Sequence, residues 1–129
     1  MPLLYFNVLE GRTDTELKTM LDAAHRAMLA AFKVPERDRY QIVSEYKPSR
    51  MIVEDTGLGI PRTGKVIVVQ VVSRPRGKEA KQEFYKLLTE ELQKSCGIAP
   101  SDVMVSIVEN SDEDWSFGLG RAQFLEGDL

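Results

Sequence analysis

The sequence predicts an α/β fold of the α+β type, in which two βαβ units form one four-stranded mixed sheet with two helices on one face. Two observations lead to this prediction. Strand-like and helix-like hydrophobic patterns follow one another in the order β-α-β, β-α-β along the 129 residues. The second half repeats the apolar pattern of the first at an offset of 64 residues. Each half therefore has the layout of a right-handed βαβ unit, whose two strands are parallel.

The first half begins with a strand and a helix. Residues 3–10 (LLYFNVLE) are mainly aliphatic and aromatic, which predicts a strand. Residues 13–34 predict an amphipathic helix that begins at Thr13 or Asp14, with Glu16 completing a capping box. Apolar side chains recur along this helix every three or four positions, at Leu17, Met20, Leu21, Ala24, Met28 and Phe32.

The following elements complete the first unit and begin its repeat. Residues 39–46 alternate like a half-buried strand, and the turn-rich segment 47–64 forms a connecting hairpin with a short extended stretch at 49–54. Residues 65–73 (KVIVVQVVS) are so apolar that they predict a strand buried on both faces. Residues 77–97 predict a second amphipathic helix, which its final glycine would close.

The chain ends with a fourth strand and a tail. The strand is predicted at 103–109, and the tail at 111–129 is rich in glycine and aromatic residues. We therefore expect a single domain over residues 1–129, whose internal repeats are 2–46 and 66–110.

The repeat also predicts how the two halves meet. An approximate two-fold axis would place the first strand of each half at the centre of the sheet, where the two run antiparallel. The start of strand 3–10 then lies near the end of strand 65–73. This arrangement places Pro2 beside Arg74 and Arg76.

Composition excludes several classes of protein. A net charge of −3 gives no strong basic surface for nucleic acid, and the single cysteine, Cys96, excludes an internal disulfide and fits a reducing compartment. The sequence shows no signal peptide, and its apolar stretches fall far short of the roughly 20 residues of a membrane span. One histidine and one cysteine without paired spacing make no metal site. We expect a cytoplasmic protein that contacts neither nucleic acid nor membrane.

Pro2 has two interpretations. Proline lacks a backbone N–H and is tolerated at the first residue of a strand, so Pro2 can simply mark where the strand begins. If Met1 is removed, however, Pro2 becomes a secondary amine at the chain terminus. A free α-amine titrates near ~7.7–8.0 and can act as an acid or a base near neutral pH. With Met1 retained, the same nitrogen is an amide without this chemistry.

Other residues are candidates for the same site, each with a plainer alternative. Arg74 and Arg76 flank a proline that stiffens the backbone, and paired guanidiniums match a carboxylate, although both also suit a solvated turn. Asp38 precedes the second predicted strand, where a turn or cap aspartate is common. Aromatic side chains of the tail either anchor it in a core or interface or form the walls of a pocket. They are Trp115, Phe117 and Phe124.

Motifs along the whole chain resemble the malonate semialdehyde decarboxylases of the tautomerase superfamily. The most specific are SRPR (73–76) and VENSDEDWSFG (108–118), and the initial MP, VPERDRY and EDTGLG match as well. The resemblance implies a tautomerase-like fold, activity without a cofactor, and a homotrimer.

The resemblance also implies roles for individual residues. Pro2 matches the catalytic amino-terminal proline of the family, and Asp38 matches its catalytic aspartate. Arg74 and Arg76 match the catalytic arginines that bind the substrate carboxylate. The residues that match the apolar lining of the substrate pocket are Trp115, Phe117, Phe124 and Leu129.

The implied reaction is decarboxylation of a small β-keto acid, with malonate semialdehyde giving acetaldehyde and CO2, and with a hydratase side activity. Two alternatives remain on the same scaffold. One is a keto–enol tautomerase or a hydratase of unsaturated acids, with neutral Pro2 as a base or Asp38 activating water. The other is a non-enzymatic interaction protein, which the presence of Asp38 together with both arginines disfavours, because binding alone does not require that set.

Association with further copies of the chain is expected on physical grounds as well, and the resemblance points to three. The outer strands, 39–46 and 103–109, expose unpaired backbone groups and carry no proline or lysine run as protection. Segment 49–54 or the tail could cover these edges in a neighbouring copy. The sheet face without helices, to which alternation would assign Tyr5 and Val69, also needs burial. Three sheets around a central barrel would bury it, in agreement with the trimer that the resemblance implies.

Overall fold

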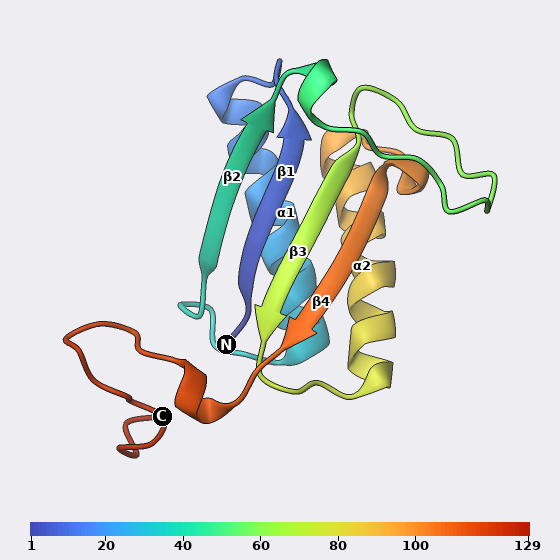
Figure 1. Cartoon of the computed structure of the whole chain (residues 1–129). Coiled ribbons are helices and arrows are strands. Elements are labelled where there is room, and N and C mark those ends of the chain that lie inside the picture. Colours follow the sequence, from blue (N-terminus) through green and yellow to red (C-terminus); the bar gives the residue numbers. More distant parts are fainter.

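The computed structural model describes residues 1–129, and it contains one four-stranded sheet with two long helices behind it (Figure 1). This arrangement confirms the predicted α+β fold. The strands are β1 (Leu3–Leu9), β2 (Tyr40–Tyr46), β3 (Ile67–Ser73) and β4 (Val103–Glu109), and the helices are α1 (Asp14–Phe32) and α2 (Lys78–Cys96). Short 3-10 helices lie at Pro48–Arg50, Pro100–Asp102 and Asp112–Asp114.

The order of strands in the sheet is β2-β1-β3-β4. β1 is parallel to β2 and β3 is parallel to β4, as the two βαβ units require, while β1 and β3 run antiparallel at the centre. Leu3 lies opposite Val72 in this central pair. The register therefore brings the start of the chain next to the segment that follows β3, as the repeat predicts.

Local signals in the sequence determine where both helices begin and end. The Thr13 hydroxyl accepts a hydrogen bond from the Glu16 N–H at 3.1 Å, and the Glu16 carboxylate accepts one from the Thr13 N–H at 2.9 Å. α1 ends at Lys33, which has a left-handed backbone (φ 52°), and α2 ends at Gly97 (φ 65°). Both helices are one or two residues shorter at their ends than predicted.

The hydrophobic core lies between the helices and one face of the sheet. Its largest fully buried side chains include Leu4, Phe6, Met20, Met28, Val69, Val71, Phe84, Leu88 and Leu92. The assignment of Val69 to the uncovered face is wrong. Val69 pairs with Phe6, so both side chains point toward the helices, while Tyr5 pairs with Gln70 on the other face.

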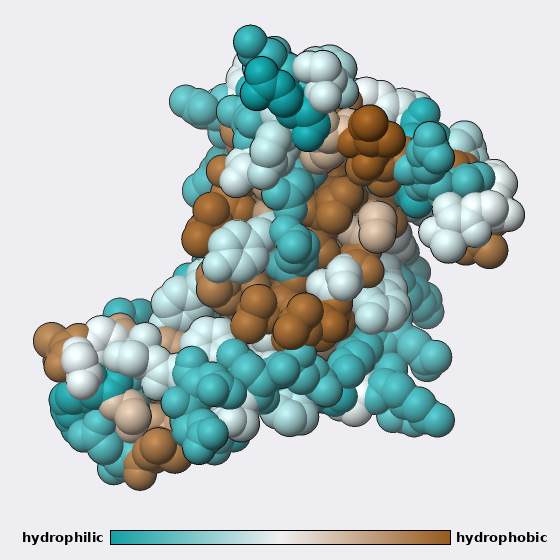
Figure 2. Space-filling model, viewed as in Figure 1, coloured by the Kyte–Doolittle hydropathy of each residue, from teal (hydrophilic) through white to brown (hydrophobic).

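The other face of the sheet is uncovered in the single chain and largely apolar (Figure 2). Tyr40, Ile42, Met104 and Val108 are exposed large hydrophobic residues of the two outer strands. The prediction that β3 is buried on both faces is wrong for one chain, because both helices pack on the same side and leave Gln70 exposed.

The connection between β2 and β3 is only partly as predicted. It begins with the 3-10 helix Pro48–Arg50, and although Met51 has extended backbone, no strand forms in the predicted stretch 49–54. The Asp55 carboxylate then accepts hydrogen bonds from Gly57 N–H and Gly59 N–H, which closes a local turn. Neither long helix has an apolar stretch that could span a bilayer.

Candidate active site

The predicted site residues come from segments that meet at one end of the sheet. These are the start of β1, the turn between α1 and β2, the segment after β3 and the C-terminal tail. Figure 1 shows the amino terminus close to the ends of β3 and β4, with the tail on the same side of the molecule. Sheet register alone places Pro2 there, because the neighbouring Leu3 pairs with Val72 near the end of β3.

A charged pair is found where the chain begins. The terminal nitrogen of Met1 lies 3.9 Å from Oδ2 of Asp38. Asp38 is only 5% exposed, and neither of its carboxylate oxygens has a hydrogen-bond partner. Pro2 is buried next to Met1, and its nitrogen is part of a peptide bond while Met1 is present. A carboxylate buried without partners beside an amine is typical of a functional site, because such burial costs free energy.

Burial and neighbouring charges shift the pKa of both groups. The pKa of the Met1 amine falls from 8.0 to about 6, chiefly through burial and then through the nearby Arg76 and Arg74 guanidiniums, against the opposing effect of Asp38. Burial raises the pKa of the Asp38 carboxyl, while the terminal amine and Arg76 act in the opposite direction. The site therefore disfavours the charged forms of both the amine and the carboxyl.

Arg76 is held in place on two sides. Its Nε donates a hydrogen bond to the hydroxyl of the fully buried Ser73 at 3.0 Å, and its backbone N–H donates to the Glu109 carboxylate at 2.6 Å. The guanidinium lies over the Phe32 ring, 5.2 Å from its centre. Burial and the charge of Arg74 lower the pKa of Arg76 from its ordinary value. An anion placed near this half-buried cation would be attracted more strongly than near a fully exposed one, because less water screens the charge.

Arg74, unlike Arg76, has its side chain paired with a carboxylate. Its Nε pairs with Oδ1 of Asp112 at 2.6 Å, and its guanidinium lies 4.3 Å from the centre of the Phe124 ring. The two arginines are thus close enough for each to affect the same terminal amine, but one has a carboxylate partner already. A substrate carboxylate that binds Arg74 would have to share the guanidinium with Asp112 or displace Asp112 from it.

Aromatic residues of the tail pack into one cluster. The rings of Trp115 and Phe117 are stacked at 5.5 Å, and Phe117 meets Phe124 edge-on at 5.4 Å. Tyr40 at the start of β2 stacks on Phe117 at 5.9 Å. The Trp115 indole N–H donates a hydrogen bond to Asn110 at 2.7 Å, which fixes the first turn of the tail. The cluster fastens the tail to the end of the sheet where the chain begins.

A cavity of about 360 Å³ lies between the turn, the chain start and the tail. Its lining residues include Met1, Asp38, Phe117 and Leu129, which come from three of the four segments named above, the chain start, the turn and the tail. A larger cavity, of about 440 Å³, lies at the opposite end of the sheet and is lined by none of the predicted site residues. No group of three or more His, Cys, Asp or Glu side chains is arranged to hold a metal ion.

The structure brings the predicted residues to one region, but only some of them line the cavity. Asp38, Phe117 and Leu129 line the cavity itself. Pro2 lies one residue inside the terminal amine, and the two arginines affect that amine electrostatically. Trp115 and Phe124 contact the cavity wall through Phe117, so they support it from behind.

Sequence reasoning missed four residues of this region. Ser73 orients Arg76, Asp112 pairs with Arg74, and Tyr40 and Arg37 line the cavity. Signals for them existed, since Ser73 and Asp112 belong to the two most specific motifs and Arg37 immediately precedes Asp38. Their contacts depend on distant segments, however, and spacing along the chain does not contain that information.

Comparison with known proteins shows the family of the chain. Two family models, both described as tautomerase enzyme, match residues 38–118 and 2–60. Probable tautomerase YrdN of Bacillus subtilis (strain 168) is 56% identical over 129 residues, which is 100% of each chain. The chain therefore belongs to the tautomerase superfamily of enzymes.

Solved structures extend the comparison. A malonate semialdehyde decarboxylase, studied in wild-type, mutant and inactivated forms for its decarboxylase and hydratase activities, is 58% identical, with a TM-score of 0.97 and 98% of each chain covered. The FG41 malonate semialdehyde decarboxylase inhibited by 3-bromopropiolate is 38% identical, with a TM-score of 0.94 and 98% and 97% covered. A fused 4-OT symmetric trimer, 23% identical with a TM-score of 0.78 and 97% and 98% covered, shares the fold.

Proposed function

We propose that this enzyme decarboxylates a small β-keto acid without a cofactor, and that malonate semialdehyde is its substrate. The observation that carries the proposal is the placement of the chain start and the buried Asp38 at one cavity, with two arginines near enough to act on the terminal amine. The malonate semialdehyde decarboxylase that is 58% identical over nearly the whole chain supports the same substrate. The products would be acetaldehyde and CO2.

The chemistry requires a cation near the substrate carbonyl. When the bond between the carboxylate and the methylene carbon breaks, its electron pair moves into the neighbouring carbonyl and forms an enolate. A positive group at that oxygen stabilises this charge more in the transition state than in the ground state. After loss of Met1, protonated Pro2 would supply it through a hydrogen bond. Return of a proton to the carbon then gives acetaldehyde.

The two arginines would orient the carboxylate that leaves as CO2. Arg76 is the better placed, because its Ser73 contact fixes the guanidinium without neutralising it. Arg74 already pairs with Asp112, so its hold on the substrate would be weaker. A hold of limited strength suits this reaction, because the product CO2 is neutral and must depart.

Asp38 and the aromatic tail would complete the site. Asp38 would accept a hydrogen bond from the aldehyde hydrate or activate a water molecule in a hydratase side reaction. Phe117, backed by Trp115 and Phe124, would exclude water and so favour the loss of charge when CO2 forms.

A second candidate function is a keto–enol tautomerase or a hydratase on the same residues. It is favoured by the surroundings of the chain start, where burial and the two arginines lower the pKa of the Met1 amine to about 6. The same surroundings would favour the neutral form of a terminal Pro2 amine, which is suited to act as a base. The relative from Bacillus subtilis is also named a probable tautomerase.

We further propose that the active form is a homotrimer. Its basis is the uncovered apolar face of the sheet, where exposed side chains such as Ile42 and Val108 would be buried by neighbouring copies (Figure 2). The fused 4-OT protein of the same fold is described as a trimer.

One experiment separates the two candidate functions. Mass spectrometry first establishes that the preparation begins at Pro2, and the same sample is assayed for CO2 release from malonate semialdehyde and for phenylpyruvate tautomerisation. A decarboxylase with an acidic Pro2 loses activity as the pH rises through the pKa of that amine, whereas an enzyme with a basic Pro2 gains activity. Tautomerisation without CO2 release would contradict the proposal.

A further inference from the structure

Three buried side-chain polar atoms of the structure lack a hydrogen-bond partner, and they belong to only two residues. They are Nδ1 of His25 and both carboxylate oxygens of Asp38. Buried polar atoms are nearly always paired, because an unpaired one has lost its hydrogen bonds to water without replacing them. Asp38 belongs to the proposed active site, whereas the proposed mechanism gives His25 no part.

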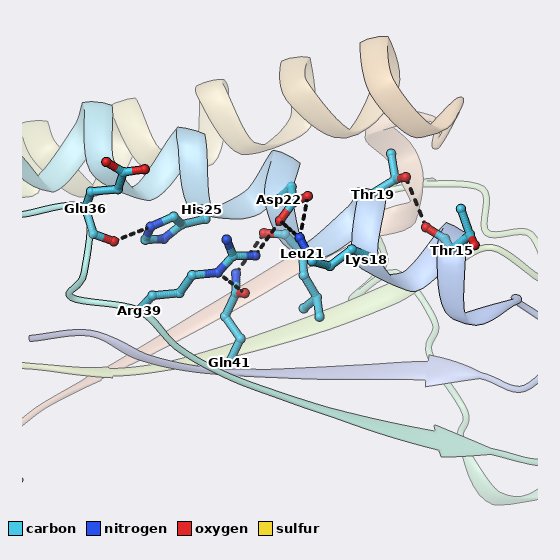
Figure 3. Close-up of polar contacts among 9 residues, drawn as sticks. All are labelled: Thr15, Lys18, Thr19, Leu21, Asp22, His25, Glu36, Arg39 and Gln41. Atoms are coloured by element: carbon cyan, nitrogen blue, oxygen red, sulfur yellow. Dashed lines mark hydrogen bonds and ion pairs between the residues drawn. The ribbon is translucent and has the colours of Figure 1, made fainter.

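The second nitrogen of His25 does have a partner. Nε2 lies 2.8 Å from the backbone oxygen of Glu36 (Figure 3), and the residue is only 5% exposed. Because a carbonyl oxygen can only accept, Nε2 must carry the proton and donate it. His25 therefore links helix α1 to the turn that leads into β2.

That turn is the one that holds Asp38. Glu36 is two residues before Asp38, and the Asp38 backbone N–H donates a hydrogen bond to the Pro35 oxygen at 2.9 Å. His25 approaches this short loop from the side of α1 (Figure 3). Its hydrogen bond to Glu36 thus restrains the backbone immediately before the carboxylate.

A second set of contacts restrains the backbone immediately after it. Arg39 donates from Nη2 to Oδ1 of Asp22 at 2.7 Å and from Nε to Oε1 of Gln41 at 2.8 Å. Gln41 in turn donates to the Leu21 backbone oxygen at 2.8 Å. Figure 3 shows both sets of contacts reaching the same helix. Asp38 lies between two points at which its turn is fastened to α1.

We propose that His25 is a positioning residue for Asp38 and acts through the Glu36 carbonyl. The carboxylate has no hydrogen bond of its own, so its place depends on the backbone that carries it. Loss of the His25 bond would free the turn on one side and move the carboxylate away from its place 3.9 Å from the terminal amine. The inference rests on the proposed catalytic role of Asp38.

Two substitutions of similar polarity test this. In His25→Gln the side-chain amide nitrogen can reach the place of Nε2 and keep the bond, whereas in His25→Asn it reaches only the place of Nδ1. We expect His25→Asn to lower kcat for CO2 release about 10- to 100-fold with KM changed less than twofold, because misplacement of a reacting group acts mainly on kcat. His25→Gln should keep at least half of the wild-type kcat.

Arg26→Leu is the matched control. It lies on the next position of α1, and its side chain bonds Glu91 and Ser95 of α2 rather than the Asp38 turn. Its kinetics should be those of the wild type even where urea unfolding shows a loss of stability. Wild-type kinetics in a folded His25→Asn protein, or an equal loss of kcat in His25→Gln, would overturn the proposal.

A measurement on the wild-type protein is independent of activity and of variant folding. The chain has one histidine, so its imidazole 15N signals need no assignment. They should show the proton on Nε2, and the Nδ1-protonated tautomer would refute the proposed bond. Hydrogen exchange of the Asp38 backbone amide should be faster in His25→Asn than in the wild type, and it should be unchanged in His25→Gln and Arg26→Leu. If CO2 release is absent altogether, the proposed function fails, while these signals still decide the role of His25.

Discussion

At the scale of single residues, Asp38 combines a proposed catalytic role with a cost in stability. Its pKa is raised by burial, so the folded state binds a proton more readily than the unfolded chain. By linkage, the raised pKa of Asp38 contributes to the stability of the fold at low pH. This contribution is lost as the pH rises through the folded-state pKa. Ionisation of Asp38 in the folded protein therefore carries a free-energy cost.

We accordingly predict that Asp38→Asn raises stability at pH 7 by about 1 kcal/mol and lowers kcat about 100-fold. Thermal unfolding between pH 4 and 8 and steady-state kinetics would measure both effects. Asp102→Asn is the control, because Asp102 accepts hydrogen bonds from the Thr63 N–H and hydroxyl and should lose stability when changed. An Asp38→Asn protein less stable than the wild type at every pH would contradict this account.

The chain start provides a second prediction. A preparation that retains Met1, or one acetylated at Pro2, should fold normally and release no CO2 above background, because neither offers a free proline amine. Circular dichroism and a CO2-release assay on matched processed and unprocessed samples would check this. Undiminished turnover in a blocked sample would show that the amine takes no part in the reaction.

The arginines are expected to differ in their effects. Arg76→Ala should raise KM and lower kcat, together reducing kcat/KM by about 1000-fold, because a half-buried cation oriented by Ser73 is lost. Arg74→Ala should act in the same direction but about tenfold less, since Asp112 already neutralises that guanidinium. Kinetics with saturating substrate would separate the two parameters. Equal effects of the two substitutions would indicate that Asp112 leaves Arg74 when substrate binds.

At the scale of elements, the predictions that succeeded rest on local signals. The capping box of Thr13 and Glu16 is local, and so are the heptad-like spacing of α1 and the glycine that ends α2. We expect Thr13→Ala to cost about 1 kcal/mol in urea unfolding without changing kcat, because this cap lies far from the cavity. A Thr13→Ser protein should recover most of that loss, and an unchanged midpoint in Thr13→Ala would show that the cap contributes nothing.

Predictions were less accurate for residues whose placement depends on contacts with distant parts of the chain. The side of the sheet on which Val69 lies depends on its pairing with Phe6, and an apolar run such as 65–73 looks the same whether one face is covered or two. In the candidate site, too, contacts between distant segments were not predicted. A resemblance of motifs selected Asp38, Arg74 and the tail aromatics, yet the Asp112 partner of Arg74 is evident only once the tail has folded back.

At the scale of the whole molecule, the uncovered sheet face determines the expected assembly. Its exposed side chains on β2 and β4 would aggregate unless they were buried in a defined contact. Sedimentation equilibrium should therefore give three times the mass of the chain. Ile42→Lys and Val108→Lys together should produce monomers with reduced activity, while Leu58→Lys in the β2–β3 connection should not. A fully active monomer would refute the proposed trimer.

The two halves of the molecule contain equivalent turns whose aspartates have different contacts. Asp38 and Asp102 occupy equivalent places at the 64-residue offset, and each donates its backbone N–H three residues back, at 2.9 Å, to Pro35 and Ala99. One carboxylate is fully paired and the other has no partner. Only one of the two turns has the start of the chain beside it, since Val66, the counterpart of Pro2, lies inside the chain. Asp38 takes the proposed catalytic role there, while Asp102 in the other turn holds the fold together through Thr63.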